Sequence, residues 1–158
     1  VRAELVARVR AGGVDTLGTD HSPCPPAMKD TPDFFEMWGG IAGAQSFLPA
    51  LRAAGIEVEA VARLTASRVA RRFGLAGSKG AIAPGMDADL VLLDPRDRRT
   101  LRTEDLLTRH AVSPYVGREF PVAVGVVWVR GAVAWSRAGG RGSSRGRLVR
   151  PLLSHSAA

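Results

Sequence analysis

The chain contains a single cysteine, Cys24, among its 158 residues. One cysteine excludes an internal disulfide framework and a zinc site built from several cysteines, and it fits a reducing compartment such as the cytoplasm. Long hydrophobic runs are lacking as well, since no apolar stretch approaches the roughly 20 residues that a membrane-spanning helix requires. The N-terminal residues have no apolar signal core. We therefore expect neither secretion nor a membrane partner.

Acidic residues are scarcer than basic ones, and the formal net charge is +7. A basic balance is typical of nucleic-acid-binding proteins. Here, however, much of the excess lies in a stretch rich in Gly and Ser, without the interleaved aromatic residues that a base-stacking surface needs. We expect a basic, flexible tail over residues 137–158 and no nucleic-acid partner. The arginines of this stretch are Arg137, Arg141, Arg145, Arg147 and Arg150.

The first half of the chain has the pattern of an α/β protein. Residues 1–11 have apolar positions at four-residue spacing and predict a helix that ends at two glycines. The β-prone segment 14–20 follows and predicts a strand, and further helices are expected over about 42–54 and 58–73. This order is typical of a parallel sheet covered by helices. The apolar face predicted for the last helix comprises Val58, Val61, Ala62, Thr65, Val69 and Phe73.

The composition changes near Ala76, and the second half is rich in β-formers. The sequence DLVLLDP at 89–95 predicts one strand, and FPVAVGVVWVRGAVAW at 120–135 predicts two strands joined at its Arg-Gly pair. We therefore predict three parts. Residues 1–76 form the α/β part, 77–136 a small β domain, and 137–158 the tail.

The sequence TDHSPCPP at 19–26 is the first candidate for chemistry. Its prolines exclude regular structure. Asp20 ends the predicted strand, and in a (β/α) barrel the side chains at the C-terminal ends of strands face the active site. A carboxylate there can ligate a divalent metal and take a proton from a bound water. Alternatively, Asp20 caps the loop by accepting backbone N–H bonds. The residues alone leave these two interpretations equal.

The neighbouring residues have weaker claims to catalysis. Cys24 lacks an adjacent base, so a passive or substrate-lining thiol is a better interpretation than a nucleophile. Ser22 lacks the Gly-x-Ser-x-Gly setting of a hydrolase serine. His21 is interpreted either as a residue that orients the site or as an ordinary hydrogen-bonded loop residue, and His110 as structural. One carboxylate cannot hold a catalytic metal alone, because such sites normally use three or more protein ligands.

Several motifs, taken together, resemble the cyclic amidohydrolases, the group of dihydroorotases, dihydropyrimidinases (hydantoinases) and allantoinases. TDHSPCPP followed by MWGGIAGAQ at 37–45 resembles the closing section of their barrel. Residues 64–95 resemble the passage from barrel to β-sandwich, and residues 110–135 resemble the end of that sandwich. Asp-His-Ser-Pro-Cys, Trp-Gly-Gly-Ile and Ser-Pro-Tyr-x-Gly at 113–117 resemble the allantoinase branch most closely.

The resemblance implies the C-terminal part of a metal-dependent (β/α)8 barrel, or TIM barrel, followed by part of a small β-sandwich. It implies that Asp20 is both a catalytic residue and a ligand of one metal, zinc in type, of a binuclear pair. Cys24, Gly39 and Gly40 match the part of the family's pocket that contacts substrate. The implied reaction is hydrolysis of a cyclic amide or ureide, allantoin to allantoate in purine catabolism, by a cytoplasmic homotetramer.

Much of the implied metal site is missing from the sequence. There is no His-x-His motif, and the two lysines, Lys29 and Lys79, lie in a loop and at the predicted entry to the β-sandwich, where neither matches the family's bridging lysine. We therefore expect a C-terminal fragment of the enzyme that is inactive alone. The alternatives are the same part of a hydantoinase or dihydropyrimidinase, and a non-catalytic remnant that binds a partner chain.

Overall fold

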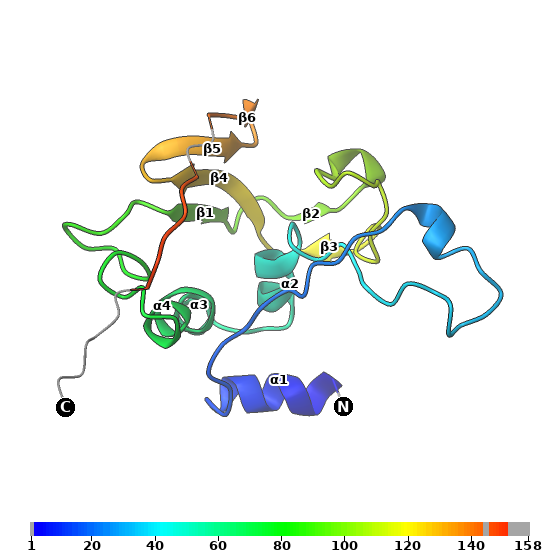
Figure 1. The fold of residues 1–158 in the computed structure, drawn as a ribbon, viewed down its shortest axis with the longest axis horizontal. Helices are drawn as coiled ribbons and strands as arrows, with labels where there is room; N and C mark the ends of the chain where they lie inside the picture. The colour runs from blue at the N-terminus through cyan, green and yellow to red at the C-terminus, as the bar shows by residue number, and fades with distance from the viewer. Residues whose placement is uncertain (1, 144–145, 152–158) are drawn as a thin grey trace. The chain divides into compact units, whose positions relative to one another are not determined.

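The computed structural model describes residues 2–143 and 146–151 of the chain as a mixture of helices, strands and long connections (Figure 1). The chain divides into two compact units that interleave along the sequence. Unit 1 consists of Val1–Leu17, Ile56–Asp94 and Val124–Ala158, and unit 2 consists of Gly18–Gly55 and Pro95–Ala123. Ala76, near which the composition changes, lies inside unit 1.

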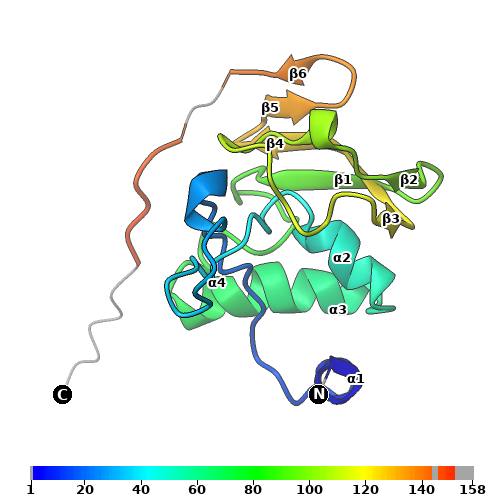
Figure 2. The same ribbon diagram turned by 90° about the vertical axis from the view of Figure 1, so that its right-hand side faces the viewer.

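The helices of unit 1 lie where the sequence predicts them. α1 spans Arg2–Arg10 and ends before Gly12, whose φ of +79° is in the region that favours glycine. α3 (Val58–Ala62), η2 (Arg63–Ser67) and α4 (Arg68–Arg72) follow one another directly and form one continuous helix (Figure 2). No helix in the described part of the chain is long and apolar enough to cross a membrane.

The apolar face predicted for this long helix is wrong at both ends and at Ala62, which is exposed. Val58 is 49% exposed and Phe73 is 59% exposed. Between them lies η2, a π-helical turn in which the Arg68 N–H donates to the Arg63 carbonyl, five residues earlier. Such a turn shifts the face of the residues that follow it, such as Phe73, whereas Val58 precedes it. The residues buried along the helix are Val61, Leu64 and Ala70.

A four-stranded sheet in the order β1-β4-β5-β6 forms the β part of unit 1 (Figure 2). β1 spans Leu90–Asp94, β4 spans Ala123–Val129 and β5 spans Ala132–Ser136. The strands predicted at 89–95 and within 120–135 are thus confirmed. Antiparallel β4 and β5 are joined by Arg130 and Gly131, with φ of +54° and +80°. Two left-handed residues are typical of the two-residue turns that match the twist of a hairpin.

The first residues of segment 137–158, expected to form a tail, are paired with this sheet. β6 (Gly140–Arg141) lies antiparallel to β5, with Gly140 opposite Ser136 and Arg141 opposite Trp135. Gly140 has a φ of +67°, which lets the chain reverse and return along β5. Of the predicted tail, residues 144–145 and 152–158 lie outside the described residues, Arg145 among them.

Unit 2 consists mainly of loops around α2 (Phe47–Ala53) and the two-stranded antiparallel pair of β2 (Arg99–Thr100) and β3 (Glu119–Phe120). The short 3-10 turns η1 (Pro26–Met28) and η3 (Thr103–Asp105) lie in the connections. α2 begins later than the sequence predicts, because residues 44–46 form a turn first.

Residues 14–20 form no strand, although the sequence predicts one. A strand of a parallel sheet needs a neighbour to complete its hydrogen bonds. Among the described residues, the nearest pairing is an isolated parallel bridge between His21 and Ile41. The segment is therefore an irregular connection in this chain, and the strand prediction is wrong here because no neighbouring strand pairs with it.

Candidate functional site

The candidate site lies in unit 2, where the TDHSPCPP loop runs beside residues 38–44. The Ser22 N–H donates to the Ile41 carbonyl at 2.9 Å. The indole N–H of Trp38 donates back to the Ser22 carbonyl at 3.0 Å. Two of the motifs named from the sequence are thus held together by hydrogen bonds in both directions.

Gly40 is the point where these two segments come closest. A Cβ placed on Gly40 would lie 2.5 Å from the Ser22 carbonyl oxygen and 2.6 Å from the Ser22 Cβ. Gly39, in contrast, has nothing within 4 Å of the corresponding position. Any side chain at position 40 would force the two segments apart, so the glycine there is required by the close approach.

His21 connects the loop to the residues that follow Ile41. Its Nδ1 accepts hydrogen bonds from the backbone N–H groups of Gly43 and Ala44, each at 3.1 Å. Backbone N–H groups only donate, so Nδ1 carries no proton and accepts them through its lone pair. The neutral ring therefore has its proton on Nε2. The structure shows the second interpretation drawn from the sequence, a hydrogen-bonded loop residue.

The third motif, at 113–117, is hydrogen-bonded to the same segment, residues 38–44. The Ser113 hydroxyl donates to the Ala42 carbonyl at 2.9 Å. The Gln45 amide donates to the Asp105 carbonyl at 2.7 Å, and its oxygen accepts the Leu107 N–H at 2.8 Å. The sequence shows these residues inside the motifs, but spacing along the chain gives no signal that the motifs touch. The connecting roles of Trp38, Gln45 and Ser113 were missed for that reason.

Asp20, the predicted metal ligand, has an exposed side chain and a φ of +43°. Left-handed backbone is uncommon for a residue other than glycine, and such conformations cluster at functional sites. The next backbone N–H, that of His21, is bonded to the Thr19 hydroxyl at 3.2 Å rather than to Asp20. At that position the loop is therefore capped by Thr19.

The residues of this chain do not complete a metal site. Within residues 2–143 and 146–151, no three His, Cys, Asp or Glu side chains are grouped so that they could hold a metal ion. Asp20 offers one carboxylate, and Cys24 is only 6% exposed. A catalytic zinc site normally takes three protein ligands. Asp20 can therefore supply one ligand of such a site, and the described residues do not supply the rest.

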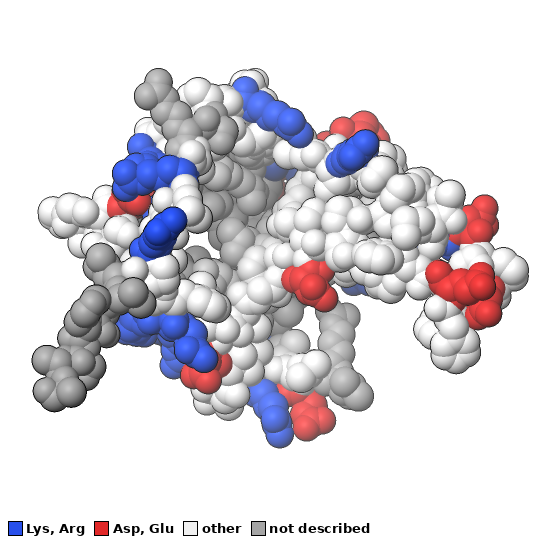
Figure 3. All heavy atoms as spheres, viewed as in Figure 1, with Lys and Arg blue, Asp and Glu red and all other residues white. Residues whose placement is uncertain are grey.

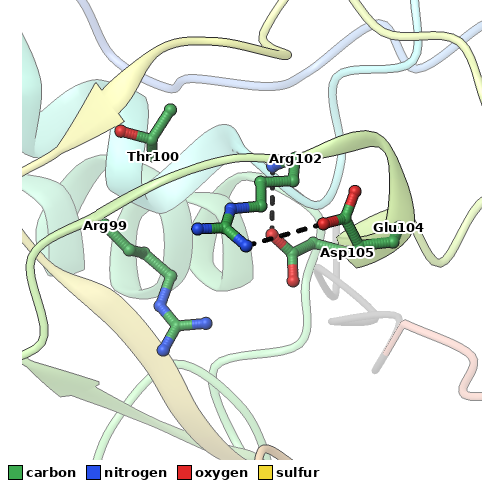
Figure 4. Close-up of a pocket in the computed structure, with 5 residues that line it drawn as sticks. All are labelled: Arg99, Thr100, Arg102, Glu104 and Asp105. Carbon is green, nitrogen blue, oxygen red and sulfur yellow. Dashed lines mark hydrogen bonds and ion pairs between the residues drawn. The ribbon is translucent and has the colours of Figure 1, made fainter.

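A surface cavity in unit 2 lies apart from the predicted site residues. Its lining comes from β2, η3 and the residues between them: Arg99, Thr100, Arg102, Glu104 and Asp105 (Figure 4). The charges in it are already compensated, because Arg99 pairs with Asp97 at 3.1 Å and Arg102 lies 3.7 Å from Glu104. The Asp105 carboxylate accepts the Arg102 N–H at 3.0 Å. This arrangement stabilises the η3 turn and offers no unpaired cation for an anionic ligand.

A second charged cluster lies in unit 1. The Lys79 ammonium pairs with Asp87 at 2.8 Å and with Asp89. The pKa of Lys79 is raised by its hydrogen bond to Asp87, which has the larger effect, and by that to Asp89. The hydrogen bond from Lys79 in turn lowers the pKa of Asp87. Burial acts to raise the pKa of Asp89, but the hydrogen bonds from Lys79 and from the Arg130 N–H outweigh it and lower the pKa. The cluster joins the loop before β1 to the β4–β5 turn.

Basic side chains form several separate patches on the face that Figure 3 displays. Several arginines have acidic neighbours, such as Arg98 with Glu119 at 3.3 Å. Separate, partly neutralised patches on this face differ from the continuous basic groove that tracks a nucleic-acid backbone.

Comparison with known proteins decides the family. Residues 2–134 match the Amidohydrolase family. The chain belongs to this family. It is 50% identical over 154 residues to an allantoinase of Rubrobacter xylanophilus, covering 93% of this chain and 33% of that protein. It is 44% identical over 152 residues to an allantoinase of Solibacter usitatus, again covering 93% of this chain and 33% of the relative. The chain therefore spans about a third of the length of the curated relatives that it matches.

Solved structures of related amidohydrolases superpose on most of this chain. A D-hydantoinase (dihydropyrimidinase) from Thermus sp. superposes with a TM-score of 0.81 at 29% identity, over 89% of this chain and 32% of that one. An L-hydantoinase (dihydropyrimidinase) from Arthrobacter aurescens has a TM-score of 0.76 at 26% identity, over 92% of this chain and 32% of that one. The resemblance found in the sequence is thus confirmed, and the mixed helix and strand structure has an amidohydrolase fold.

Proposed function

We propose that this chain carries part of the active site of an allantoinase-type enzyme, which opens a cyclic amide or ureide by hydrolysis. One observation carries the proposal. The motifs at 19–26, 37–45 and 113–117, distant in sequence, are joined in unit 2 by hydrogen bonds through Ser22, Trp38 and Ser113. The identity to two allantoinases, at 50% and 44%, supports allantoin as the substrate.

In this proposal Asp20 is the catalytic residue and one metal ligand. Its exposed carboxylate and left-handed backbone lie at the end of segment 14–20, beside the loop that contains Cys24. A divalent cation bound there, zinc in type, would polarise the ring carbonyl and make a water molecule more acidic. Asp20 would accept the proton of the attacking water and pass it to the ring nitrogen that leaves. The other ligands would come from the part of the enzyme that this chain does not span.

The substrate would lie against Gly39, Gly40 and Cys24. Gly39 leaves open space beside the backbone, so a planar ring can approach its peptide groups closely. Gly40 keeps this segment next to the loop that contains Asp20. Cys24 is buried in the same unit, and its neutral thiol suits an uncharged ring better than a carboxylate. These features support an uncharged ureide as the substrate.

For the complete enzyme we propose a (β/α)8 barrel whose last part is residues 1–76, a β-sandwich that includes residues 77–136, and a homotetrameric assembly. The β1-β4-β5-β6 sheet is consistent with a sandwich portion. The exposed residues on the α1 and α3 helices, such as Leu5 at 57% and Val58 at 49%, are consistent with helices that pack on further barrel elements.

Hydantoin or dihydropyrimidine hydrolysis is the second candidate. The superposition on a D-hydantoinase with a TM-score of 0.81 favours it. The sequence identity is lower, however, at 29% against 50% for the Rubrobacter allantoinase. Both candidate reactions hydrolyse the amide bond of a ring and assign the same role to Asp20, so only the ring substrate distinguishes them.

A hybrid enzyme tests the proposal. In it, residues 2–134 of this chain replace the matching segment of the Rubrobacter xylanophilus allantoinase. We expect the zinc-loaded hybrid to hydrolyse allantoin faster than hydantoin or dihydrouracil. Asp20→Asn should lower kcat at least about a thousandfold, because a metal ligand and a proton acceptor are lost together.

Asp15→Asn is the matched control, since Asp15 is an exposed aspartate five positions earlier on the chain. It should leave the rate of the hybrid unchanged. Thermal melting of each variant separates loss of activity from loss of folding. A hybrid whose D20N variant keeps its rate within about tenfold would contradict the role of Asp20. Preference for hydantoin over allantoin would favour the second candidate.

A further inference from the structure

We propose, on the basis of the function proposed above, that His21 is a positioning residue. Through its Nδ1 atom it sets the backbone of residues 39–44 in relation to Asp20. His21 follows Asp20 directly in the chain, and its ring reaches the segment that contains Gly39 and Gly40. Its backbone is joined to Asp20, the proposed proton acceptor. Its ring is hydrogen-bonded to the segment that contains the proposed substrate-binding glycines.

The two hydrogen bonds at Nδ1 meet a specific need of the backbone. Gly43 is buried, so its N–H is shielded from water and needs an acceptor within the protein. The Ala44 N–H lies at the start of the turn that leads into α2. Nδ1 accepts both N–H groups at 3.1 Å. Without this acceptor the buried Gly43 N–H would remain unsatisfied, and the segment would have to move to find a partner.

The same segment is held on its other side by Ser113. The hydroxyl of Ser113 donates to the Ala42 carbonyl at 2.9 Å, and Ala42 is only 7% exposed. Residues 42–44 are therefore fixed between the His21 ring, through their N–H groups, and Ser113, through a carbonyl. Gly40, two residues earlier, already touches Ser22. Residues 40–44 are therefore held at several points while the Nδ1 contact is intact.

The consequence for catalysis is geometric. Attack on the ring requires reacting atoms about 3 to 3.5 Å apart, and a displacement of about 1 Å can lower the rate about a hundredfold. If the backbone at Gly39 and Gly40 moves away from Asp20, the substrate ring moves with it. Loss of the Nδ1 acceptor should therefore weaken substrate binding and slow the reaction, although His21 touches no reacting atom.

Two substitutions separate the acceptor from the rest of the ring. In His21→Asn the amide oxygen can take the place of Nδ1, whereas in His21→Gln the longer side chain places its amide near the position of Nε2. Hydrogen exchange of the Gly43 and Ala44 amides in the full chain, resolved by NMR, is the first measurement. We expect exchange at least about tenfold faster in H21Q and within about threefold of the unsubstituted chain in H21N.

His110→Gln provides the matched control, because it replaces an imidazole elsewhere in unit 2. It should leave exchange at Gly43 and Ala44 unchanged. In the hybrid enzyme, H21Q should lower kcat/KM at least about tenfold with a raised KM, and H21N should recover most of the loss.

Equal exchange in H21Q and the unsubstituted chain would overturn the role of His21, as would H21N exchanging as fast as H21Q. Unprotected Gly43 and Ala44 amides in the unsubstituted chain would overturn it as well. Exchange requires no catalysis, so it tests the Nδ1 contact of His21 even if the hybrid has no activity. Failure of the Asp20 experiment would instead count against the proposed function.

Discussion

At the scale of single residues, Gly39 and Gly40 are adjacent in sequence but have different structural roles. Gly40 is confined by the Ser22 backbone, with 2.5 Å between the site of a Cβ and the Ser22 carbonyl oxygen. Gly39 faces open space. Glycine is used at position 40 because nothing larger fits, and at position 39 because a substrate could approach there under the proposed function.

Gly40→Ala should therefore destabilise the chain, and Gly39→Ala should not. The added methyl at position 40 must push the TDHSPCPP loop away from residues 38–44, which should cost about 1–3 kcal/mol of unfolding free energy. The change at Gly39 should cost less than about 0.5 kcal/mol. Denaturant titration of the two variants measures both values. Equal unfolding midpoints would show that Ser22 and Gly40 are not in contact.

At the scale of elements, the Lys79 cluster connects the loop before β1 to the hairpin of β4 and β5. Asp89 accepts the Arg130 N–H at 2.8 Å, and the Ala88 carbonyl accepts the Gly131 N–H at 3.0 Å. Gly80, next to Lys79, has a φ of +87° and packs on α4, where a Cβ would lie 2.6 Å from that of Ala70. The loop thus joins the sheet and the long helix of unit 1.

This cluster predicts how stability depends on pH. The folded pKa values of Asp87 and Asp89 lie below their ordinary value of 3.8, so their stabilisation is present above that value and is lost as the pH falls through the folded values. The folded pKa of Lys79 lies above its ordinary 10.5. Its stabilisation is present below 10.5 and is lost as the pH rises through the folded value.

Lys79→Met should lower the melting temperature at neutral pH and reduce the loss of stability between about pH 5 and about pH 2. The reason is that the carboxylates lose the cation that lowers their pKa. Arg72→Met is the control, because it removes one exposed positive charge from the same unit without touching the cluster. Melting curves recorded across this pH range measure the effect. If K79M and R72M show the same pH dependence, the cluster contributes nothing specific.

At the scale of the whole molecule, the chain contains one proposed metal ligand and about a third of the length of its allantoinase relatives. A catalytic metal needs further ligands, and none of the described side chains form such a group. The amidohydrolase fold is recognisable without them, because the fold depends on the hydrophobic pattern and the turns rather than on the metal.

The purified chain, supplied with zinc, should therefore not hydrolyse allantoin. The hybrid enzyme described above is the positive control, since it adds the remaining two thirds of an allantoinase to the same residues. Production of allantoate would be followed colorimetrically over hours at high protein concentration. Turnover that depends on Asp20 in the chain alone would mean that a competent site forms without the expected ligands.

Local chemistry was readable from the sequence. The helix ends at Gly12, Gly55 and Gly74 and the hairpin at Arg130 and Gly131 were predictable, because positive φ and turn geometry depend on neighbouring residues only. The motif around Asp20, taken together with those at 37–45 and 113–117, also indicated the family, since short runs of unusual residues are informative without knowledge of their contacts.

Packing across the chain was decided by the tertiary structure. The π-turn at Arg63–Ser67 shifted the face of the residues that follow it, such as Phe73, and segment 14–20 formed no strand without a pairing neighbour. The Nδ1 contact of His21 with Gly43 and Ala44 was likewise invisible in the sequence. Burial, strand pairing and hydrogen bonds of this kind depend on residues distant in sequence, and spacing along one chain does not encode which of them meet.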